Sequence, residues 1–232
     1  MQPDKDNIAR LKEVSQGLEE LNSQVVFVGG CVAQLYATGE AATEPHPTMD
    51  VDLVVDRSSY KEYNEFCELL RNKRFRNDTT FGAPICRWTF LDEIVDVMPT
   101  NEKILGFSNR WYKAGIAHKV IYEISEGLFI NIMPAIYFVA SKMEAVFSRG
   151  GADLRYSHDF EDIVYVLNYC PEFTTQLAAS ADTELRQYLK NSFSKLLSRN
   201  NIREEIECML PREESARVGY IQSLMVSITR NQ

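Results

Sequence analysis

Two aspartates stand inside an apolar run near the start of the chain. Asp50 and Asp52 belong to the segment MDVDLVV at residues 49–55, which is otherwise typical of a buried strand. Because side chains alternate between the two faces of a strand, both carboxylates lie on one face, with Cα atoms roughly 6.5 Å apart. Burying an unpaired ion costs on the order of several kcal/mol. A hard divalent cation with oxygen ligands would neutralise both acids, so the pair predicts a metal site.

A third acid lies in a second apolar run. Asp96 stands within IVDVM at residues 94–98. Taken alone, it is equally compatible with a structural role. Three such carboxylates can hold two cations roughly 3.5 to 4 Å apart, an arrangement that activates an attacking oxygen and stabilises a leaving one in phosphoryl or nucleotidyl transfer.

A glycine pair precedes the acidic strand. Gly29 and Gly30 follow the strand predicted at residues 25–28 and precede a helical pattern at residues 31–36. A tight glycine turn before a helix can bring backbone N–H groups close to a phosphate. The segment lacks the Walker pattern and the full dinucleotide fingerprint. By itself the pair is therefore also compatible with an ordinary turn.

A second cluster lies in the C-terminal part of the chain. Lys142 and Arg149 are seven residues apart, so on a helix they project from nearly the same face, and both can contact phosphates. Ser157 is a plausible N-cap of the next helix, and an acid at Asp159 would be favoured there by the helix dipole. Asp159 and Asp162 can also orient Lys142 or Arg149 through ion pairs. Both interpretations stay open.

Both helices and strands are expected in the part of the chain that positions the glycine pair and the three aspartates. The sequence predicts an irregular loop at 39–48, helices at 6–22 and 58–72, and strands at 25–28, 49–55, 85–91, 94–98, 119–124 and 128–132. The strands at 85–91 and 94–98 are expected to form a β-hairpin with its turn at Asp92-Glu93. Beyond Pro134 the pattern becomes helical. A first helix is predicted from the core-like spacing of Ile136, Val139, Ala140, Met143 and Phe147, and further helices are predicted at 158–169, 181–198, 200–209 and 212–229. We therefore expect two domains, residues 1–133 and 134–232.

Composition limits the partners. The chain has 232 residues, 45% of them hydrophobic, which is enough for a proper core, and its formal net charge of −8 argues against a surface that wraps nucleic acid broadly. A local basic group could still contact tRNA, although the pattern favours a solvated turn; its residues are Arg71, Lys73, Arg74 and Arg76.

Other features point to a cytoplasmic protein. The five cysteines are scattered without metal-ligand spacing, which favours reduced thiols. Residues 1–20 show no apolar signal segment, and no later stretch is long enough to cross a membrane, so no membrane partner is expected. The three histidines, His46, His118 and His158, also lack ligand spacing and are assigned no catalytic role.

The order of the motifs resembles a known signature. Gly29-Gly30, then Asp50-Val-Asp52, then Asp96 look like the motifs of the polymerase-β-like nucleotidyltransferase superfamily. The later segments 142–149 and 157–163 are similar to the helical motifs of its AbiEii-type, toxin-like branch. The resemblance covers about residues 6–170. Two departures are a long loop between the glycines and the acidic strand, and the insertion at 150–156.

The resemblance implies a fold and a set of roles. The expected fold is α+β, a nucleotidyltransferase-type mixed β-sheet with flanking helices, followed by a C-terminal helical bundle. The implied roles are Mg²⁺ ligands for Asp50, Asp52 and Asp96, nucleotide contacts for Gly29, Gly30, Lys142 and Arg149, and catalytic status for Lys142, Asp159 and Asp162.

The leading hypothesis is therefore a Mg²⁺-dependent transfer of a nucleoside monophosphate from an NTP to an acceptor hydroxyl or phosphate. The acceptor is left open between tRNA, protein and a small molecule, and the branch implies an antitoxin protein as a possible partner. One alternative is an inactive nucleotide-binding or partner-binding module. A phosphatase-type nucleophile at Asp50 is disfavoured, because the strand continues apolar after Asp52 where that chemistry requires a turn.

Overall fold

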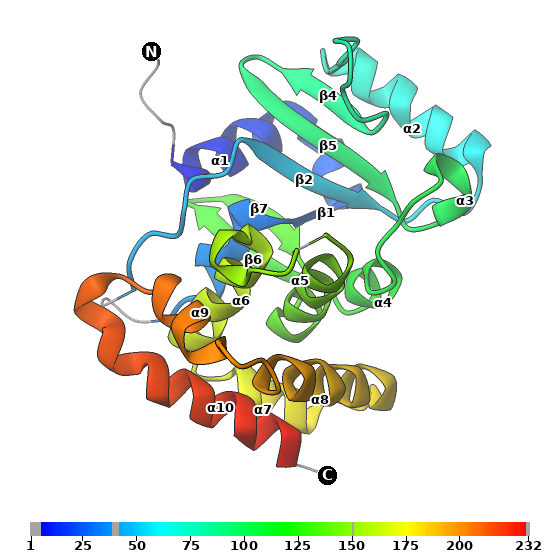
Figure 1. Ribbon diagram of the computed structural model, residues 1–232. Helices are drawn as coiled ribbons and strands as arrows, with labels where there is room; N and C mark the ends of the chain where they lie inside the picture. Colours follow the sequence, from blue (N-terminus) through cyan, green and yellow to red (C-terminus); the bar gives the residue numbers. More distant parts are fainter. Residues whose placement is uncertain (1–5, 39–41, 150, 231–232) are drawn as a thin grey trace. The chain divides into compact units, whose positions relative to one another are not determined.

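The computed structural model describes residues 6–38, 42–149 and 151–230 (Figure 1). Internal contacts divide the chain into two compact units. One comprises Met1–Val32 and His46–Pro134, and the other comprises Ala33–Pro45 and Ala135–Gln232. The division expected at residues 133 and 134 lies next to the observed one at Pro134. Residues 33–45, however, belong to the second unit although they precede the acidic strand in sequence.

A mixed sheet forms the first unit. In the described part of the chain it has seven strands in the order β3-β4-β5-β2-β1-β7-β6. Their bounds are β1 (Val25–Val28), β2 (Asp50–Val55), β3 (Arg76–Asn77), β4 (Arg87–Phe90), β5 (Glu93–Pro99), β6 (Val120–Ser125) and β7 (Leu128–Ile132). β2 runs parallel to β5, and β1 runs parallel to β7, whereas the remaining neighbours are antiparallel. The predicted α+β class with a mixed sheet is confirmed.

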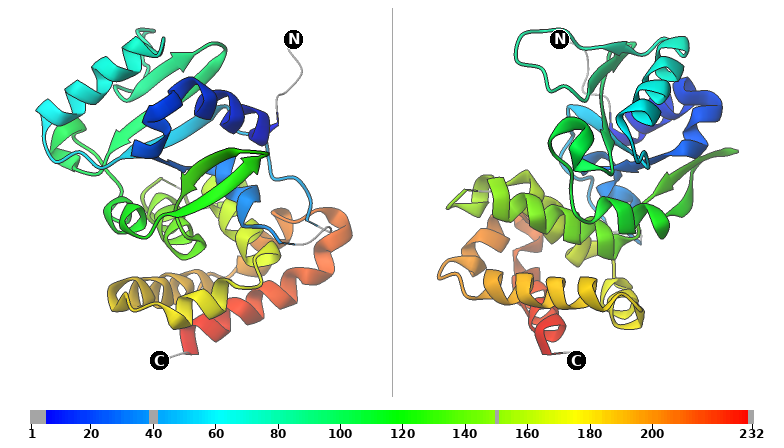
Figure 2. Two further views of the ribbon diagram at one scale, coloured as in Figure 1. Left: turned by 180° about the vertical axis from the view of Figure 1, so that it is seen from behind. Right: turned by 90° about the vertical axis from the view of Figure 1, so that its right-hand side faces the viewer.

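Helices cover the sheet and connect its strands. They are α1 (Asn7–Leu18), η1 (Glu19–Gln24), η2 (Gly30–Tyr36), α2 (Tyr60–Asn72), α3 (Glu102–Leu105) and α4 (Tyr112–Ala117), where η marks a 3₁₀ helix. Both α1 and α2 lie on one face of the sheet (Figure 2). The short helices α3 and α4 were not predicted, because neither is long enough to show a periodic pattern.

The first helix is shorter than predicted. It begins with Asp6, whose carboxylate accepts a hydrogen bond from the Ala9 amide, and it ends at Leu18 rather than at residue 22. Glu19 adopts a φ of 51°, which an α-helix cannot continue. The chain then follows η1 to the start of β1. The predicted apolar stripe is present, since Leu11, Val14 and Leu18 are fully buried.

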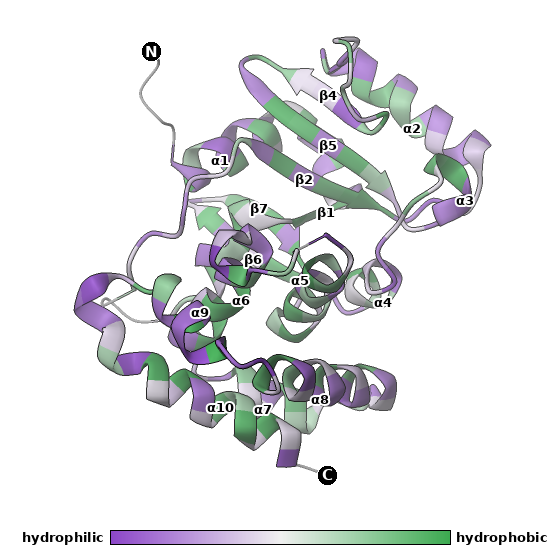
Figure 3. Cartoon of the chain, in the orientation of Figure 1, coloured by the Kyte–Doolittle hydropathy of each residue, from purple (hydrophilic) through white to green (hydrophobic). Residues whose placement is uncertain are grey.

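The central strands carry the apolar core of this unit. Figure 3 shows β1, β2 and β5 coloured mainly as hydrophobic. In β2, the half-buried Asp50 and Asp52 alternate with the fully buried Val51 and Leu53, and the strand ends with Val54 and Val55, which are both fully buried. This alternation confirms that the two acids share one face of the strand.

The turn of the β4–β5 hairpin differs from the prediction. Phe90 pairs with Glu93, so the turn is formed by Leu91 and Asp92, not by Asp92 and Glu93. Glu93 is only 1% exposed and forms an ion pair with Arg10 of α1, which holds it inside the strand. Leu91 instead takes the left-handed conformation, with a φ of 52°.

The second unit is helical. Its elements are α5 (Ala135–Arg149), η3 (Leu154–Tyr156), α6 (His158–Tyr169), α7 (Phe173–Ala179), α8 (Thr183–Leu197), α9 (Ile202–Cys208), η4 (Arg212–Arg217) and α10 (Val218–Arg230). The predicted helix at 212–229 is thus a 3₁₀ turn followed by α10, and α7 was not predicted. Among the described helices of the chain, none is both long and apolar enough to cross a membrane.

Candidate functional site

The strand register gathers the acidic residues of the first unit. Asp52 of β2 lies opposite Asp96 of β5, and on the other side Asp96 lies opposite Arg87 of β4. Residues paired across neighbouring strands project to the same face of a sheet. Asp50 shares that face because it lies two residues before Asp52. Asp50, Asp52 and Asp96 therefore form one group, which we call the carboxylate row.

The glycine turn lies directly beside this row. Val28 of β1 pairs with Asp52, so Gly29 follows at the edge of the same register. Gly29 has a φ of +72°, and a Cβ atom built on it would lie 1.9 Å from Oδ2 of Asp52. Only glycine meets both the conformational and the steric demand. The predicted proximity of the glycine turn to the acids is therefore present, while Gly30 starts η2.

The beginning of β2 is held by a small buried network. The main-chain oxygen of Asp50 accepts hydrogen bonds from the Thr48 hydroxyl at 3.0 Å and from the Cys31 thiol at 3.1 Å. The Thr48 amide in turn donates to the Asn7 side-chain oxygen at 3.0 Å. Burial raises the pKa of Cys31 to about 12, so this thiol stays protonated and acts as a donor. The network places Asp50 at the first position of its strand.

Arg87 compensates the charge of the carboxylate row. Its Nε and Nη2 donate to the two oxygens of Asp96 at 2.9 and 2.8 Å, which is the bidentate geometry of an arginine–carboxylate pair. Nη2 also lies 3.4 Å from Oδ2 of Asp50. The hydrogen bonds to Asp96 raise the pKa of Arg87 further, against the opposing effect of burial. In this structure a guanidinium therefore supplies the positive charge that the sequence assigns to a metal ion.

The donor chemistry of the row fits Mg²⁺, because carboxylate oxygens are its preferred protein ligands. As the side chains stand, no group of three or more His, Cys, Asp or Glu residues in the described ranges is arranged to hold a metal ion. Both oxygens of Asp96 already accept hydrogen bonds from Arg87. A metal ion on Asp96 would thus either lie beside the positive charge of Arg87 or displace its side chain.

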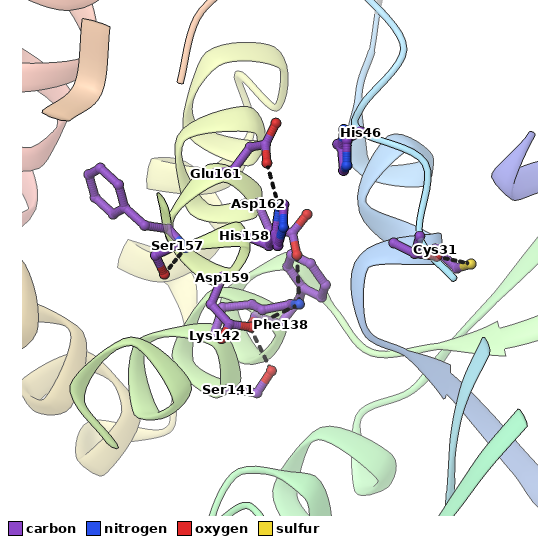
Figure 4. A network of polar contacts seen from close by, with 12 residues as sticks. Cys31, His46, Phe138, Ser141, Lys142, Ser157, His158, Asp159, Glu161 and Asp162 are labelled. Carbon is purple, nitrogen blue, oxygen red and sulfur yellow. Dashed lines mark hydrogen bonds and ion pairs between the residues drawn. The ribbon is translucent and has the colours of Figure 1, made fainter. Parts of the chain in front are cut away.

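The second unit contains the other predicted residues. Lys142 of α5 lies between two acids of α6, with its Nζ 3.2 Å from Oδ1 of Asp159 and 2.6 Å from Oδ2 of Asp162 (Figure 4). Arg149 donates to both oxygens of Asp159, from Nε at 3.0 Å and from Nη2 at 3.2 Å. The ion pairs expected from the spacing are present. We call these four residues the helical cluster.

The members of the helical cluster differ in their exposure to solvent. The side chains of Lys142, Asp159 and Asp162 are nearly buried, whereas that of Arg149 is 72% exposed. The Phe138 ring lies against Lys142, with Nζ 5.7 Å from the ring centroid. Such a lysine is held in one place by its surroundings, and Arg149 is the cation that solvent reaches.

The two acids of the cluster titrate differently. Burial raises the pKa of Asp162, and the positive charge of Lys142 only partly opposes it. Burial acts in the same direction on Asp159, but Lys142 and Arg149 together outweigh it and lower the pKa of this carboxyl. Ser157 also accepts a hydrogen bond from the Phe160 amide, so the structural explanation for an acid in this first turn holds as well.

The structure thus brings the predicted residues together in two groups. The carboxylate row and Gly29 belong to the first unit, and the helical cluster belongs to the second. The single site that the resemblance implies, with Lys142 serving the same nucleotide as the carboxylates, stays a prediction.

Arg87 is the residue that the sequence reasoning missed. The hairpin register is the signal that could have identified Arg87 as the partner of Asp96. The observed turn at Leu91 and Asp92 pairs Arg87 with Asp96. The predicted turn at Asp92 and Glu93 would instead pair Thr89 with Asp96. One misplaced turn residue therefore concealed the partner of Asp96.

A mixed sheet followed by helices is also found in a solved structure. A crystal structure of an antigenic nucleotidyltransferase-like protein from Paracoccidioides brasiliensis is similar, with a TM-score of 0.53 and 19% sequence identity over 88% of this chain and 93% of that one. At this identity the similarity concerns the fold alone. No family model matches the chain, and no curated protein matches it. The AbiEii-type branch stays a prediction.

Proposed function

We propose that this protein is a nucleotidyltransferase, which transfers a nucleoside monophosphate from an NTP to an acceptor hydroxyl or phosphate and releases pyrophosphate. The observation that carries the proposal is the register that sets Asp50, Asp52 and Asp96 on one face of β2 and β5, beside Gly29. The similarity in fold to a nucleotidyltransferase-like protein supports it.

The proposal gives each acid a task. Asp50 and Asp52 would hold Mg²⁺, and Asp96 would help to hold it and would take the proton of the acceptor hydroxyl. Bound Mg²⁺ activates the attacking oxygen and offsets the charge of the leaving pyrophosphate. The acceptor oxygen bonds to the α-phosphorus as the bond from that phosphorus to the α–β bridging oxygen breaks. No covalent intermediate with the protein is needed.

Other residues bind and orient the nucleotide in this scheme. The backbone N–H groups at Gly29 and Gly30 approach the triphosphate. Lys142 and Arg149 offset its negative charge, and Asp159 and Asp162 position Lys142 through the ion pairs described above. Asp159 and Asp162 are thus positioning residues for a phosphate-binding lysine.

For the acceptor, a protein or small molecule is favoured over tRNA. The basic group near β3 is partly neutralised within its own unit, because Lys73 is paired with Glu19 and Glu20, and Arg71 is paired with Glu68. Less positive charge is then left for an RNA backbone. A cytoplasmic location and an antitoxin partner belong to the same proposal.

The test is transfer of label from each NTP in turn, in the presence of Mg²⁺ and either bulk RNA or a cell extract. The Asp50→Asn/Asp52→Asn variant is compared with Asp92→Asn, which makes the same chemical change in the exposed turn of the hairpin. We expect the double variant to lose labelling and the Asp92 variant to keep it. Equal labelling by the wild type and the double variant would contradict the proposal.

The alternative is a module that binds nucleotides or partners without catalysis. The observation that favours it is the bidentate hold of Arg87 on Asp96, which occupies the oxygens that catalysis needs. Such a module would be stabilised against heat by an NTP and would transfer no label to any acceptor.

A further inference from the structure

Arg87 faces three carboxylates on one face of the sheet. Asp52 and Asp96 are direct cross-strand neighbours, and like charges in such positions repel. Asp50 adds a third carboxylate on the same face. Against these three acids Arg87 brings one positive charge, in contact with Asp96 and Asp50.

The two contacts of Arg87 differ in strength. The pair with Asp96 uses two short, parallel hydrogen bonds, whereas the 3.4 Å approach to Asp50 lies near the limit of hydrogen bonding. The Arg87 side chain is 24% exposed and stands on a flexible stem at the first residue of β4. The strand register fixes its backbone position, and its side chain is partly open to solvent.

We propose that Arg87 is a resident counter-cation that couples the binding of a divalent cation to the binding of the nucleotide. This inference rests on the proposed function. The bidentate pair with Arg87 uses one lone pair on each oxygen of Asp96. A cation that arrives alone must therefore either bind beside the positive charge of the guanidinium or displace it from Asp96, and both cost free energy through the repulsion of like charges.

A triphosphate offsets the unfavourable interaction between the bound cation and the positive charge of Arg87. Phosphate oxygens are bidentate acceptors for a guanidinium, as carboxylate oxygens are. A cation that arrives with a nucleotide therefore brings a new anionic partner for Arg87. The expected consequence is weak binding of the bare cation and cooperative binding of cation and nucleotide, in which each ligand tightens the other by the same factor.

The experiment follows thermal unfolding of the full chain, with Mn²⁺ as the probe cation. Three conditions are compared: no ligand, Mn²⁺ alone, and Mn²⁺ with a non-hydrolysable analogue of each ribonucleoside triphosphate in turn. Arg87→Gln is the test variant. Arg76→Gln is the matched control, since Arg76 is exposed on the adjacent strand β3 and loses the same charge.

We expect Arg87→Gln to have a lower Tm than the wild type without ligand, because the carboxylate row loses its counter-charge. Mn²⁺ alone should raise its Tm by more than it raises that of the wild type, with an affinity for Mn²⁺ about 5-fold or more tighter. The additional shift given by the nucleotide analogue should be larger in the wild type. Arg76→Gln should follow the wild type throughout.

The two proposals fail in different ways. If Mn²⁺ alone shifts Arg87→Gln by the same amount as the wild type, or by less, the coupling is overturned while the proposed function stands. If the wild type, Arg87→Gln and Arg76→Gln all fail to respond to Mn²⁺ with any analogue, the proposed function falls and the coupling falls with it.

A second variant covers the case in which Arg87→Gln does not fold. Arg87→Lys keeps the charge and loses the bidentate geometry. Its affinity for Mn²⁺ should be higher than that of the wild type and lower than that expected for a carboxylate row without any arginine contact. An affinity equal to or below that of the wild type would overturn the coupling.

Discussion

At the scale of single residues, Gly29 turns the chain from β1 into η2 with a φ of +72°, and its Cα lies against the carboxylate of Asp52. Two separate demands meet at this position. The left-handed conformation disfavours any side chain, and Asp52 leaves no space for one. Among the described glycines, those at 82, 106, 127 and 151 also have a positive φ, but nothing lies within 4 Å of a Cβ built there, so they impose only the first demand.

The prediction at this scale is that Gly29→Ala destabilises the protein more than Gly127→Ala. Gly127 has an almost identical φ of +73°, but nothing lies within 4 Å of a Cβ built there. Both variants should lose about 1 to 2 kcal/mol from backbone conformation. Gly29→Ala should lose more, because Asp52 must move. Urea unfolding of the three proteins measures the difference, and equal losses would show that Asp52 yields without cost.

At the scale of elements, the packing of α5 on α6 determines what Lys142 can do. The lysine is enclosed by Phe138 of its own helix and by two acids of the next one. Removing one partner of a nearly buried ion pair leaves an uncompensated charge, which costs on the order of 3 to 5 kcal/mol. An exposed ion pair contributes far less, about 0 to 1 kcal/mol.

We therefore expect Lys142→Met to destabilise the protein by about 3 kcal/mol at pH 8, and Arg149→Met, at the exposed end of the same cluster, by less than about 1 kcal/mol. Denaturant unfolding of both variants beside the wild type measures these losses. Similar losses in the two variants would mean that burial does not distinguish the two cations.

The loss in Lys142→Met should also depend on pH. Burial raises the pKa of Asp162 above that of an aspartate in the unfolded chain, so the stability it contributes is present below the unfolded pKa and is lost as pH rises through the native pKa. Lys142 lowers this pKa, and its removal moves the native pKa further up. Asp162 can then take up a proton more easily, and the variant should lose less stability at pH 5 than at pH 8. A loss that is larger at pH 5 would contradict this account.

At the scale of the whole molecule, the two units do not follow the order of the sequence. Residues 33–45 leave the sheet unit after β1 and join the helical unit. Tyr169 holds this segment through its hydroxyl, which lies 2.9 Å from the Thr43 hydroxyl and also bonds Glu214, and through its main-chain oxygen, which accepts from the Thr38 amide. Tyr165 adds a hydrogen bond to the main-chain oxygen of Thr43.

The prediction at this scale is that Tyr169→Phe destabilises the protein by about 1 to 2 kcal/mol, because it removes the hydroxyl that joins the segment to the helices. Tyr156→Phe is the control, since Tyr156 is 84% exposed. Urea unfolding compares the two. If both variants are as stable as the wild type, the other contacts of the segment, among them the hydrogen bonds from the Tyr165 hydroxyl and the Thr38 amide, hold it without the Tyr169 hydroxyl.

Local rules predict much of the fold. The strand at residues 25–28 and the helices at 58–72 and 158–169 follow from short-range periodicity, and each is present within two residues of the expected bounds. The prediction of the hairpin turn was wrong because local sequence rules favour two polar residues in a turn. Such rules do not detect that Arg10, some 80 residues away in sequence, holds Glu93 inside the sheet.

The sequence by itself determined that Asp50 and Asp52 share a face, because the period of a strand is a local property, and that a glycine turn precedes them. Only the tertiary structure decided what these carboxylates meet. The partner of Asp96 depends on strand register, and the register depends on the turn at Leu91 and on the buried pair of Arg10 and Glu93. Long-range packing therefore put Arg87 beside the acids that the sequence had assigned to a metal ion.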